Sequence, residues 1–434
     1  MKRPLVFLEL NEINFDIAKL YLESGVELTG FKKAFEGKFI TTESEKSYEK
    51  LEPWIQWASV HTGLSFEEHN IFRLGDIVKD YKKQIFEHVE NKGFSVGAIS
   101  AMNSKNCLEN PSYFIPDPWT KTTTDGSWLS NIIYAALSQT VNDNAEGKIN
   151  LKSFFFLIIA SLFCFKIRDL YKLSSYAISC IKYKYRKALF LDKLLFSFHK
   201  YFYSKKKPDF STIFLNGGAH IQHHYFFNSK IISYIDSNPE WYLNKELDPI
   251  LDMLKTYDEI LDELISSQDF ELLVATGLSQ EPYKRKEFYY RLKDHGKFFK
   301  RIGIKFKEIF PRMTRDFLVT FDSLEDAIEA KKNLSSIRVN GKTFLFEEIE
   351  VRKNELFITL TYPFEIKKNS FIEFNQQKIF LEEYTVFVAL KNGMHTSKGY
   401  AYFSDELSKF APSQNSHVKN LFNTINSFFD TKYD

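Results

Sequence analysis

Three histidines stand within five residues of one another, at positions 220, 223 and 224 of a 434-residue chain that has ten histidines in all. Imidazole gains and loses a proton near neutral pH, so this density predicts a functional site. The alternative is a surface loop in which the rings only make hydrogen bonds. Another histidine, His395, follows an apolar run near the C-terminus. We expect His223 and His395 to act as acid–base or phosphate-binding groups, and His220 and His224 to bind substrate.

Two glutamates are candidates for the same chemistry. Glu12 follows the first apolar run of the chain, Leu5–Leu10, and Glu52 precedes Pro53. A carboxylate at the tip of a strand can act as a general base. Each glutamate also has a structural interpretation, because a carboxylate stabilises the start of a helix and suits a turn. We predict that Glu12 and Glu52 are catalytic.

Amide side chains accompany these candidates along the sequence. Asparagine and glutamine both donate and accept hydrogen bonds, so they can bind sugar hydroxyls or phosphate oxygens. The amide candidates for substrate binding are Asn11, Asn14, Gln56, Asn216 and Gln280.

The candidates cluster after apolar runs that we expect to be strands, at residues 5–10, 210–215, 271–274 and 386–390. Residues 216–225, which hold the three histidines, are expected to be a loop. In open α/β sheets, sites form outside the carboxyl ends of the strands, so we expect these polar segments to meet there. The runs alternate with helical segments, which predicts an α/β fold with a mostly parallel central sheet flanked by helices.

Changes in sequence character divide the chain. We expect an α/β domain made of residues 1–149, 208–304 and 385–434. A basic, aromatic, helical insert at 150–207 interrupts it, and so does a small, β-rich α+β subdomain at 305–384. Strands around an Asn340-Gly341 turn predict the β content of that subdomain.

Composition excludes several classes of protein. The chain has 58 basic and 56 acidic residues, a net charge of +2, and no recognisable nucleic-acid-binding module, so no nucleic-acid partner is expected. Its three cysteines lack a CxxC spacing, which argues against a disulfide framework and a cysteine zinc site. The first apolar run is too short for a signal peptide, so we expect a cytoplasmic protein.

The insert departs from this average. Residues 150–207 contain 13 Lys and Arg against two acids, Asp169 and Asp192, which gives a local charge of +11. Its longest uncharged stretch, residues 153–165, falls short of the roughly 20 residues that span a bilayer. Basic helices with interleaved aromatics bind anionic membrane surfaces, which predicts peripheral contact with the inner membrane face. The alternative is a helix pair packed on the α/β domain with a basic outer face.

Three stretches resemble motifs of the alkaline phosphatase superfamily, in its phosphodiesterase, nucleotide-pyrophosphatase and sulfatase-like branches. Residues 8–16 resemble the first strand and its metal-ligand turn, normally Asp-Gly; residues 53–71 resemble the nucleophile helix. Residues 219–223 resemble the Asp-x-x-x-His segment, and His395 with Gly399 resembles the last metal-binding histidine. The resemblance implies the α/β fold and the handling of phosphate or sulfate esters.

The superfamily uses two divalent metals and a Thr or Ser nucleophile, and this chain departs from that pattern. Other residues stand at five of the ligand or nucleophile positions: Asn11, Ala219, Thr276, Gly277 and Leu51. The resemblance then implies that one metal site is lost, whereas the other keeps two of three ligands, His223 and His395. Glu52, beside Leu51, could stand in for the nucleophile. Asp294-His-Gly296 spells the missing Asp-His pair but lies beyond the expected strand end, so we interpret it as coincidental.

The resemblance implies an enzyme that acts on a phosphate ester, a nucleotide-sugar or a lipid-linked sugar. We expect a role in assembling or modifying a cell-surface polysaccharide. The cofactor would be either none or a single divalent metal, zinc or manganese, with His220, His224 or Glu12 completing its ligands. Two alternatives stay open: a metal-dependent phosphodiesterase with a rearranged ligand set, and a non-catalytic scaffold that binds glycan or lipid.

Overall fold

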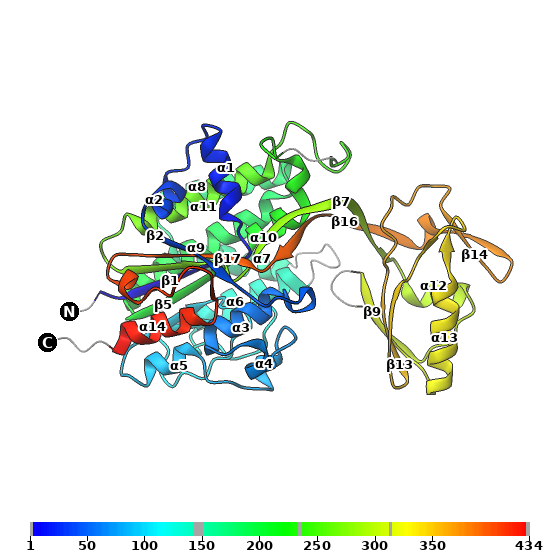
Figure 1. The fold of residues 1–434 in the computed structure, drawn as a ribbon, viewed down its shortest axis with the longest axis horizontal. Helices are drawn as coiled ribbons and strands as arrows, with labels where there is room; N and C mark the ends of the chain where they lie inside the picture. The colour runs from blue at the N-terminus through cyan, green and yellow to red at the C-terminus, as the bar shows by residue number, and fades with distance from the viewer. Residues whose placement is uncertain (1–2, 143–150, 233–236, 312–314, 431–434) are drawn as a thin grey trace. The chain divides into compact units, whose positions relative to one another are not determined.

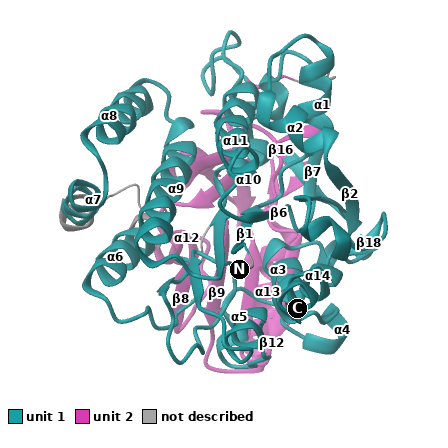
Figure 2. Ribbon diagram, turned by 90° about the vertical axis from the view of Figure 1, so that its left-hand side faces the viewer, with its two compact units in different colours: residues 1–234, 239–282, 393–434 teal, residues 235–238, 283–392 magenta. Residues whose placement is uncertain are grey.

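Two compact units make up the chain in this computed structural model (Figures 1 and 2). Unit 1 contains residues 1–234, 239–282 and 393–434, and unit 2 contains residues 235–238 and 283–392. The structure describes residues 3–142, 151–232, 237–311 and 315–430.

The predicted boundaries can be set beside these units. The predicted subdomain, residues 305–384, falls within unit 2, and the insert falls within unit 1. The predicted start of the insert, at residues 149 and 150, lies outside the described residues.

Unit 1 is built on an eight-stranded sheet with the order β18-β2-β17-β6-β1-β5-β3-β4. Its strands are β1 (Leu5–Leu10), β2 (Lys38–Glu43), β3 (Val96–Ile99), β4 (Tyr113–Ile115), β5 (Phe210–Leu215), β6 (Glu271–Ala275), β17 (Lys398–Phe403) and β18 (Ser416–His417). The central strand β1 pairs in parallel with β5 and β6, and only the two pairings of β17 are antiparallel among those of this sheet. The predicted α/β fold with a mostly parallel sheet is confirmed.

Helices cover both faces of this sheet (Figure 1). One layer contains α3 (Pro53–Thr62), α5 (Ile85–Glu90) and α14 (Asn420–Asp430); the other contains α1 (Phe15–Glu23), α2 (Thr29–Glu36), α9 (Arg186–Lys206), α10 (Gly217–Tyr225) and α11 (Pro249–Ile265). Every residue of β1 is buried, because helices lie on both sides of it. Phe7 packs against Trp57 of α3, with ring centroids 6.1 Å apart.

The insert is helical, as predicted, with α7 (Leu151–Cys164) and α8 (Ile167–Lys182) before α9. Helix α9 is tied to α11 by three ion pairs: Arg186–Asp252, Lys193–Glu259 and Lys200–Glu263. Part of the basic charge of the insert is therefore neutralised inside unit 1. No helix in the described part of the chain is both long enough and apolar enough to cross a membrane.

Unit 2 contains two small antiparallel sheets. One has the order β12-β13-β9-β8, from Glu348–Arg352, Glu355–Thr359, Asp316–Thr320 and Glu308–Pro311; the other has the order β11-β10-β14-β15, from Thr343–Phe344, Arg338–Val339, Phe371–Phe374 and Gln377–Phe380. Helices α12 (His295–Arg301) and α13 (Leu324–Ser336) belong to the same unit. Asn340 and Gly341 both have positive φ, as the predicted two-residue turn requires.

Two segments differ from the sequence-based expectation. Residues 217–225, expected as a loop, form helix α10. The apolar run near the C-terminus belongs to β16 (Thr385–Thr396), which pairs with β7 (Ser279–Leu292) in a separate two-stranded sheet instead of joining the central one. The Gly217-Gly218 pair suggests a loop by propensity, but here it permits close packing: a Cβ on Gly218 would lie 2.1 Å from Ile13 Cδ1.

Helices α2 and α11 approach so closely that Gly30 leaves no room for a side chain. A Cβ there would lie 2.3 Å from the main-chain oxygen of Asp258 and 2.5 Å from the main-chain nitrogen of Asp262. Backbone atoms cannot move aside singly, so Gly30→Ala should lower the free energy of unfolding by about 1–3 kcal/mol. Denaturant unfolding measures this loss. The exposed Lys32→Ala on the same helix should change stability by less than about 0.5 kcal/mol, and equal effects of the two substitutions would contradict the assignment.

Candidate functional site

Three predicted site residues meet although they are far apart in the sequence. Glu12 lies in the turn after β1, His223 lies in the last turn of α10, and His395 lies near the end of β16. Their ligand atoms converge: Glu12 Oε2 is 3.2 Å from His223 Nε2 and 3.1 Å from His395 Nε2. The two imidazole nitrogens are 3.3 Å from each other. These three atoms form a nearly equilateral triangle.

The three side chains of this triangle differ in their exposure to solvent. The Glu12 side chain is 3% exposed, that of His395 is 13% exposed, and that of His223 is 33% exposed. The carboxylate therefore forms the floor of the site, and His223 is the member that solvent reaches most readily.

Hydrogen bonds from the surrounding chain fix Glu12. Asn11 Nδ2 donates to Glu12 Oε1 at 2.9 Å, Gln280 Nε2 donates to Glu12 Oε2, and Gln222 Nε2 donates to the Glu12 main-chain oxygen at 2.7 Å. The Glu12 N–H donates to the oxygen of Thr276. Glu12 has a φ of 63°, a left-handed conformation that a residue with a Cβ adopts at a cost of about 1–2 kcal/mol. Such strain persists where the surroundings over-determine the conformation, as these contacts do.

The charges of the three groups depend on one another. Burial by itself would raise the pKa of Glu12, but the imidazoles of His395 and His223 hold it well below its usual value. For His395, burial by itself would lower the pKa, yet the nearby Glu12 and Glu52 carboxylates raise it above its usual value. The buried carboxylate is thus kept ionised, and it favours a positive charge beside it.

Glu52 approaches His395 from the other ring nitrogen. Its Oε2 lies 3.8 Å from His395 Nδ1, and its side chain is partly buried at the start of α3. This carboxylate adds negative charge beside the His395 ring, and the predicted role of Glu52 as a base or nucleophile stays a prediction.

Asn11 and Asn216 support the floor of the site. Asn11 Nδ2 also donates to Asn216 Oδ1 at 2.7 Å, and Asn11 Oδ1 accepts a hydrogen bond from Trp57 Nε1 at 2.8 Å. The amide of Asn11 is therefore engaged through both of its polar atoms. Trp57, fully buried, uses its indole N–H to hold the residue that precedes Glu12.

Asn14 and Gln56 hold local structure. Asn14 Oδ1 accepts from the N–H groups of Asp16 and Ile17 and so caps α1, and Asn14 Nδ2 donates to the Gln280 oxygen. Gln56 Nε2 donates to the Lys50 oxygen at 2.8 Å. Their predicted part in substrate binding stays a prediction.

The other two histidines of the cluster pack together. The rings of His220 and His224 have centroids 4.7 Å apart. Among the described residues, the group whose atoms converge closely enough to hold a metal ion consists of Glu12, His223 and His395.

Asp192 and Tyr257 hold the start of α10, and sequence analysis missed this role. Asp192 Oδ2 accepts from the Gly217 N–H at 2.8 Å, and Asp192 Oδ1 accepts from the Asn216 N–H at 3.2 Å. Tyr257 donates its hydroxyl to Asp192 and accepts from the Gly218 N–H at 2.6 Å. These contacts satisfy the free N–H groups of the helix that carries His223. The available signal was that Asp192 is one of only two acids in a strongly basic segment.

No protein-family model matches the sequence, and a search of curated proteins finds no match. The chain is similar in structure to phosphonoacetate hydrolase from Sinorhizobium meliloti, with 11% identity and a TM-score of 0.43 over 98% of this chain and 96% of that one. It is also similar to murine ectonucleotide pyrophosphatase/phosphodiesterase 5, with 9% identity and a TM-score of 0.40 over 99% and 96%. A variant of alkaline phosphatase PafA has 11% identity and a TM-score of 0.44 over 99% and 96%.

These three proteins are members of the alkaline phosphatase superfamily. They are similar to this chain at the identities and TM-scores given.

The role of Asp192 is testable through the pH dependence of stability. Burial raises the pKa of Asp192 to about 7, against the opposing effect of its hydrogen bonds. The folded state therefore binds the carboxyl proton of Asp192 more tightly than the unfolded state does. The resulting contribution to the free energy of unfolding is fully present below about pH 4 and is lost as the pH rises to about 7. Relative to Asp192→Asn, which does not titrate, the native chain should lose stability over that interval. Urea unfolding at several pH values measures it, and parallel pH profiles would contradict the assignment.

Proposed function

We propose that this chain is a hydrolase or transferase of phosphate esters that works with one divalent metal ion, held by Glu12, His223 and His395. The observation that carries the proposal is the triangle of ligand atoms, whose sides measure 3.1, 3.2 and 3.3 Å. Around a tetrahedral ion with bonds of about 2.1 Å, ligand atoms lie about 3.4 Å apart. Two imidazoles and one carboxylate also form a ligand set of catalytic zinc sites, with a fourth position open.

A metal explains this arrangement better than acid–base catalysis by the same residues alone. Both imidazoles direct the same kind of atom, Nε2, at one another and at a carboxylate that their charges keep ionised. A single proton between the two Nε2 atoms can serve only one of these contacts, whereas a shared cation would contact all three ligand atoms at once. Of the alternatives that the sequence left open, the metal-dependent enzyme with a rearranged ligand set is therefore the one we favour, with zinc or manganese as the ion.

The rearrangement moves the carboxylate ligand by one residue. The superfamily motif that the sequence resembles has Asp followed by Gly where this chain has Asn11 and Glu12. Glu12 keeps a positive φ, which suits a glycine position, while its side chain supplies the carboxylate that Asn11 lacks. Because Ala219 and Thr276 replace further ligands of the motif, we propose that the centre binds a single metal.

The residues around the ligands would set their geometry. Asn11 and Gln280 hold the Glu12 carboxylate, and Glu52 faces Nδ1 of His395, which leaves Nε2 as the ligand atom. A bound divalent ion would stabilise the negative charge that develops on a phosphoryl oxygen. His223, the most exposed of the three ligands, marks the side from which a substrate can enter.

The substrate we propose is a phosphate ester of a sugar, either a nucleotide-sugar or a lipid-linked sugar, used in building or modifying a cell-surface polysaccharide. The motif resemblance supports the phosphate ester, and the exposed surface of the insert supports a substrate at the inner membrane face. A scaffold that binds glycan or lipid without turnover is the competing possibility, and it predicts no product from any donor.

Metal content and turnover test the site together. The purified chain should contain close to one zinc or manganese ion, measured by mass spectrometry of the metals. Glu12→Gln and His223→Ala should each remove the metal ion. They should also lower kcat/KM on a panel of nitrophenyl phosphate esters and nucleotide-sugars by about 100-fold or more. Gln280→Ala should weaken metal binding by about 10–100-fold.

His224→Ala is the matched control, because it removes a neighbouring imidazole outside the ligand triangle. It should retain the metal and most of the activity. Metal content and turnover that survive in Glu12→Gln and His223→Ala would contradict the proposal.

We also propose that the insert contacts an anionic membrane through α8. Four apolar side chains spaced along one stripe of this helix are widely exposed: Ile167 by 86%, Tyr171 by 75%, Ile178 by 67% and Ile181 by 81%. The exposed cations Arg168, Lys172 and Lys182 belong to the same helix. An apolar stripe beside cations complements an anionic lipid surface. Helix α9 instead forms ion pairs between several of its cations and acids of α11, so we assign the membrane contact to α8.

Sedimentation with vesicles tests this contact. The native chain should bind phosphatidylglycerol vesicles in a salt-sensitive way and phosphatidylcholine vesicles weakly, since both the cations and the apolar stripe contribute. Ile178→Ser combined with Ile181→Ser should abolish most of the binding. Ile328→Ser combined with Phe364→Ser, at two exposed apolar positions of unit 2, is the control. Equal binding by the two double variants would exclude α8. Point substitutions are preferable to removing residues 150–207, because α9 holds Asp192.

A further inference from the structure

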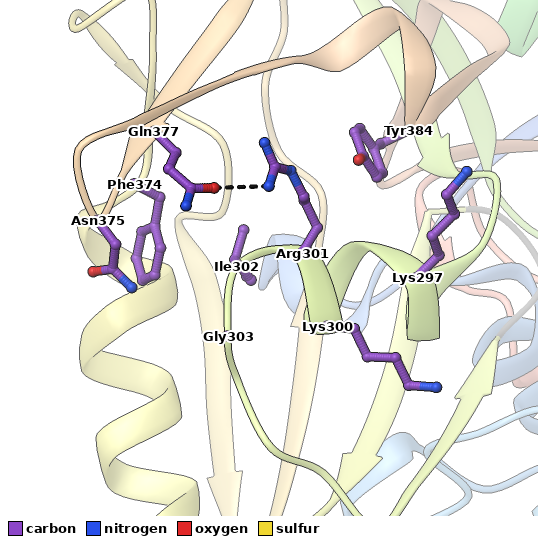
Figure 3. A pocket seen from close by; sticks show the side chains of 9 residues that line it. All are labelled: Lys297, Lys300, Arg301, Ile302, Gly303, Phe374, Asn375, Gln377 and Tyr384. Carbon is purple, nitrogen blue, oxygen red and sulfur yellow. Dashed lines mark hydrogen bonds between the residues drawn. The ribbon is translucent and has the colours of Figure 1, made fainter.

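Unit 2 has a cavity of about 470 Å³ that belongs to no part of the site described above. It lies between the end of α12 and the hairpin formed by β14 and β15 (Figure 3). Six of its lining residues can interact with a charged ligand: Lys297, Lys300, Arg301, Asn375, Gln377 and Tyr384. Its volume falls within the range of about 300–1,000 Å³ that is usual for small-molecule sites.

The local sequence concentrates positive charge at this cavity. Residues 293–307 contain six Lys and Arg and one acid, Asp294. Asp294 Oδ1 accepts the Lys297 N–H and caps α12, so its charge is used at the opposite end of the helix. Phe298 and Phe299 are fully buried, which fixes the rotation of the helix. Lys297, Lys300 and Arg301, at the spacing i, i+3 and i+4, are exposed and line the cavity together.

These cations have no acidic counterpart in the cavity. None of the lining residues is acidic, and within the described ranges none of the three forms an ion pair. Arg301 Nη1 donates to Gln377 Oε1 at 2.7 Å, and Lys297 Nζ lies 5.9 Å from the Tyr384 ring centroid (Figure 3). Both partners are neutral, so the contacts position the cations without neutralising them. An anion bound in the cavity would therefore meet cations without a competing carboxylate.

The hairpin opposite α12 supplies polar groups to the cavity. Asn375 and Gln376 form the two-residue turn between β14 and β15, and both have the positive φ that such a turn requires, 47° and 61°. The tight turn places Asn375 and Gln377 in the lining.

We propose that this cavity binds the pyrophosphate group of a small ligand. The guanidinium of Arg301 keeps further N–H donors beyond the one that Gln377 accepts, and such a fork matches two phosphate oxygens. Lys297 adds a point charge on the Tyr384 side of the cavity, whereas the Lys300 side chain points away from Arg301 (Figure 3). Arg301 and Lys297 together suit a ligand with two adjacent phosphates. The amides of Asn375 and Gln377 and the Tyr384 hydroxyl add hydrogen-bonding groups. The proposal does not depend on the metal centre of unit 1.

Calorimetric titration of the full chain with inorganic pyrophosphate tests the proposal. One binding event is expected, with an affinity that falls steeply between about 50 mM and about 500 mM NaCl, because screening weakens the attraction. Lys297→Ala combined with Arg301→Ala should weaken binding by about tenfold or more. Lys332→Ala combined with Lys342→Ala removes the same charge from exposed positions of unit 2 outside the cavity, and it should leave the affinity unchanged.

Three results would overturn the proposal: no binding by the native chain, equal loss in the two double variants, or loss in Glu12→Gln, which would place the ligand at the metal centre instead. Circular dichroism and thermal unfolding of each variant separate lost binding from lost folding. Uridine diphosphate in solution and a polyprenyl diphosphate in phosphatidylcholine vesicles then distinguish a nucleotide from a lipid as the source of the pyrophosphate. The source is the ligand whose affinity falls in Lys297→Ala combined with Arg301→Ala.

Discussion

A carboxylate taken out of water must be compensated by the protein, and in this chain the buried Glu12 imposes that requirement on several distant segments. Asn11, Gln280, His223 and His395 all contact its side chain, and they come from the first strand's turn, from β7, from α10 and from β16. Removing a charge from water without partners costs several kcal/mol, so these segments are held to one another by the same group. The strand order brings these segments together. Strands β5 and β6 flank β1, so the residues that follow all three strands lie at the same edge of the sheet.

Helix α10 connects this centre to the insert. His223 lies at one end of α10, and the other end is held by Asp192 of α9 and by Tyr257 of α11. The insert is therefore part of the support of the site and not an appendage. Its positive charge is divided accordingly: α9 pairs cations with the acids of α11, while α8 leaves cations and apolar side chains exposed. Helix α8, which carries this exposed surface, and helix α9, which supports the helix that holds His223, are thus consecutive helices of the insert.

The candidate chemistry differs from that of the motifs that the sequence resembles. A two-metal centre clamps both the attacking and the leaving oxygen of a phosphoryl group. A single centre with two imidazoles and one carboxylate would leave part of that task to protein groups, and Glu52 and Asn216 lie beside the candidate ligands. Where the resembled motif has Asp-Gly, this chain has Asn11-Glu12, and Glu12 adopts the left-handed conformation that suits a glycine.

Several features could be predicted from sequence, because continuous apolar runs and the residues after them are local signals. They are the buried strands Leu5–Leu10, Phe210–Leu215 and Glu271–Ala275, the helical insert, and the candidates Glu12, His223 and His395. The sequence did not show that residues 217–225 form a helix, whose start is held by Asp192 and Tyr257. Nor could it show that Asn11 is engaged by Trp57, or that His395 arrives on a ribbon outside the central sheet. Local pattern determined the elements and the chemical types of the site. Tertiary structure alone decided which atoms meet, because hydrogen bonds and charge pairs between residues hundreds of positions apart leave no periodic trace in the chain.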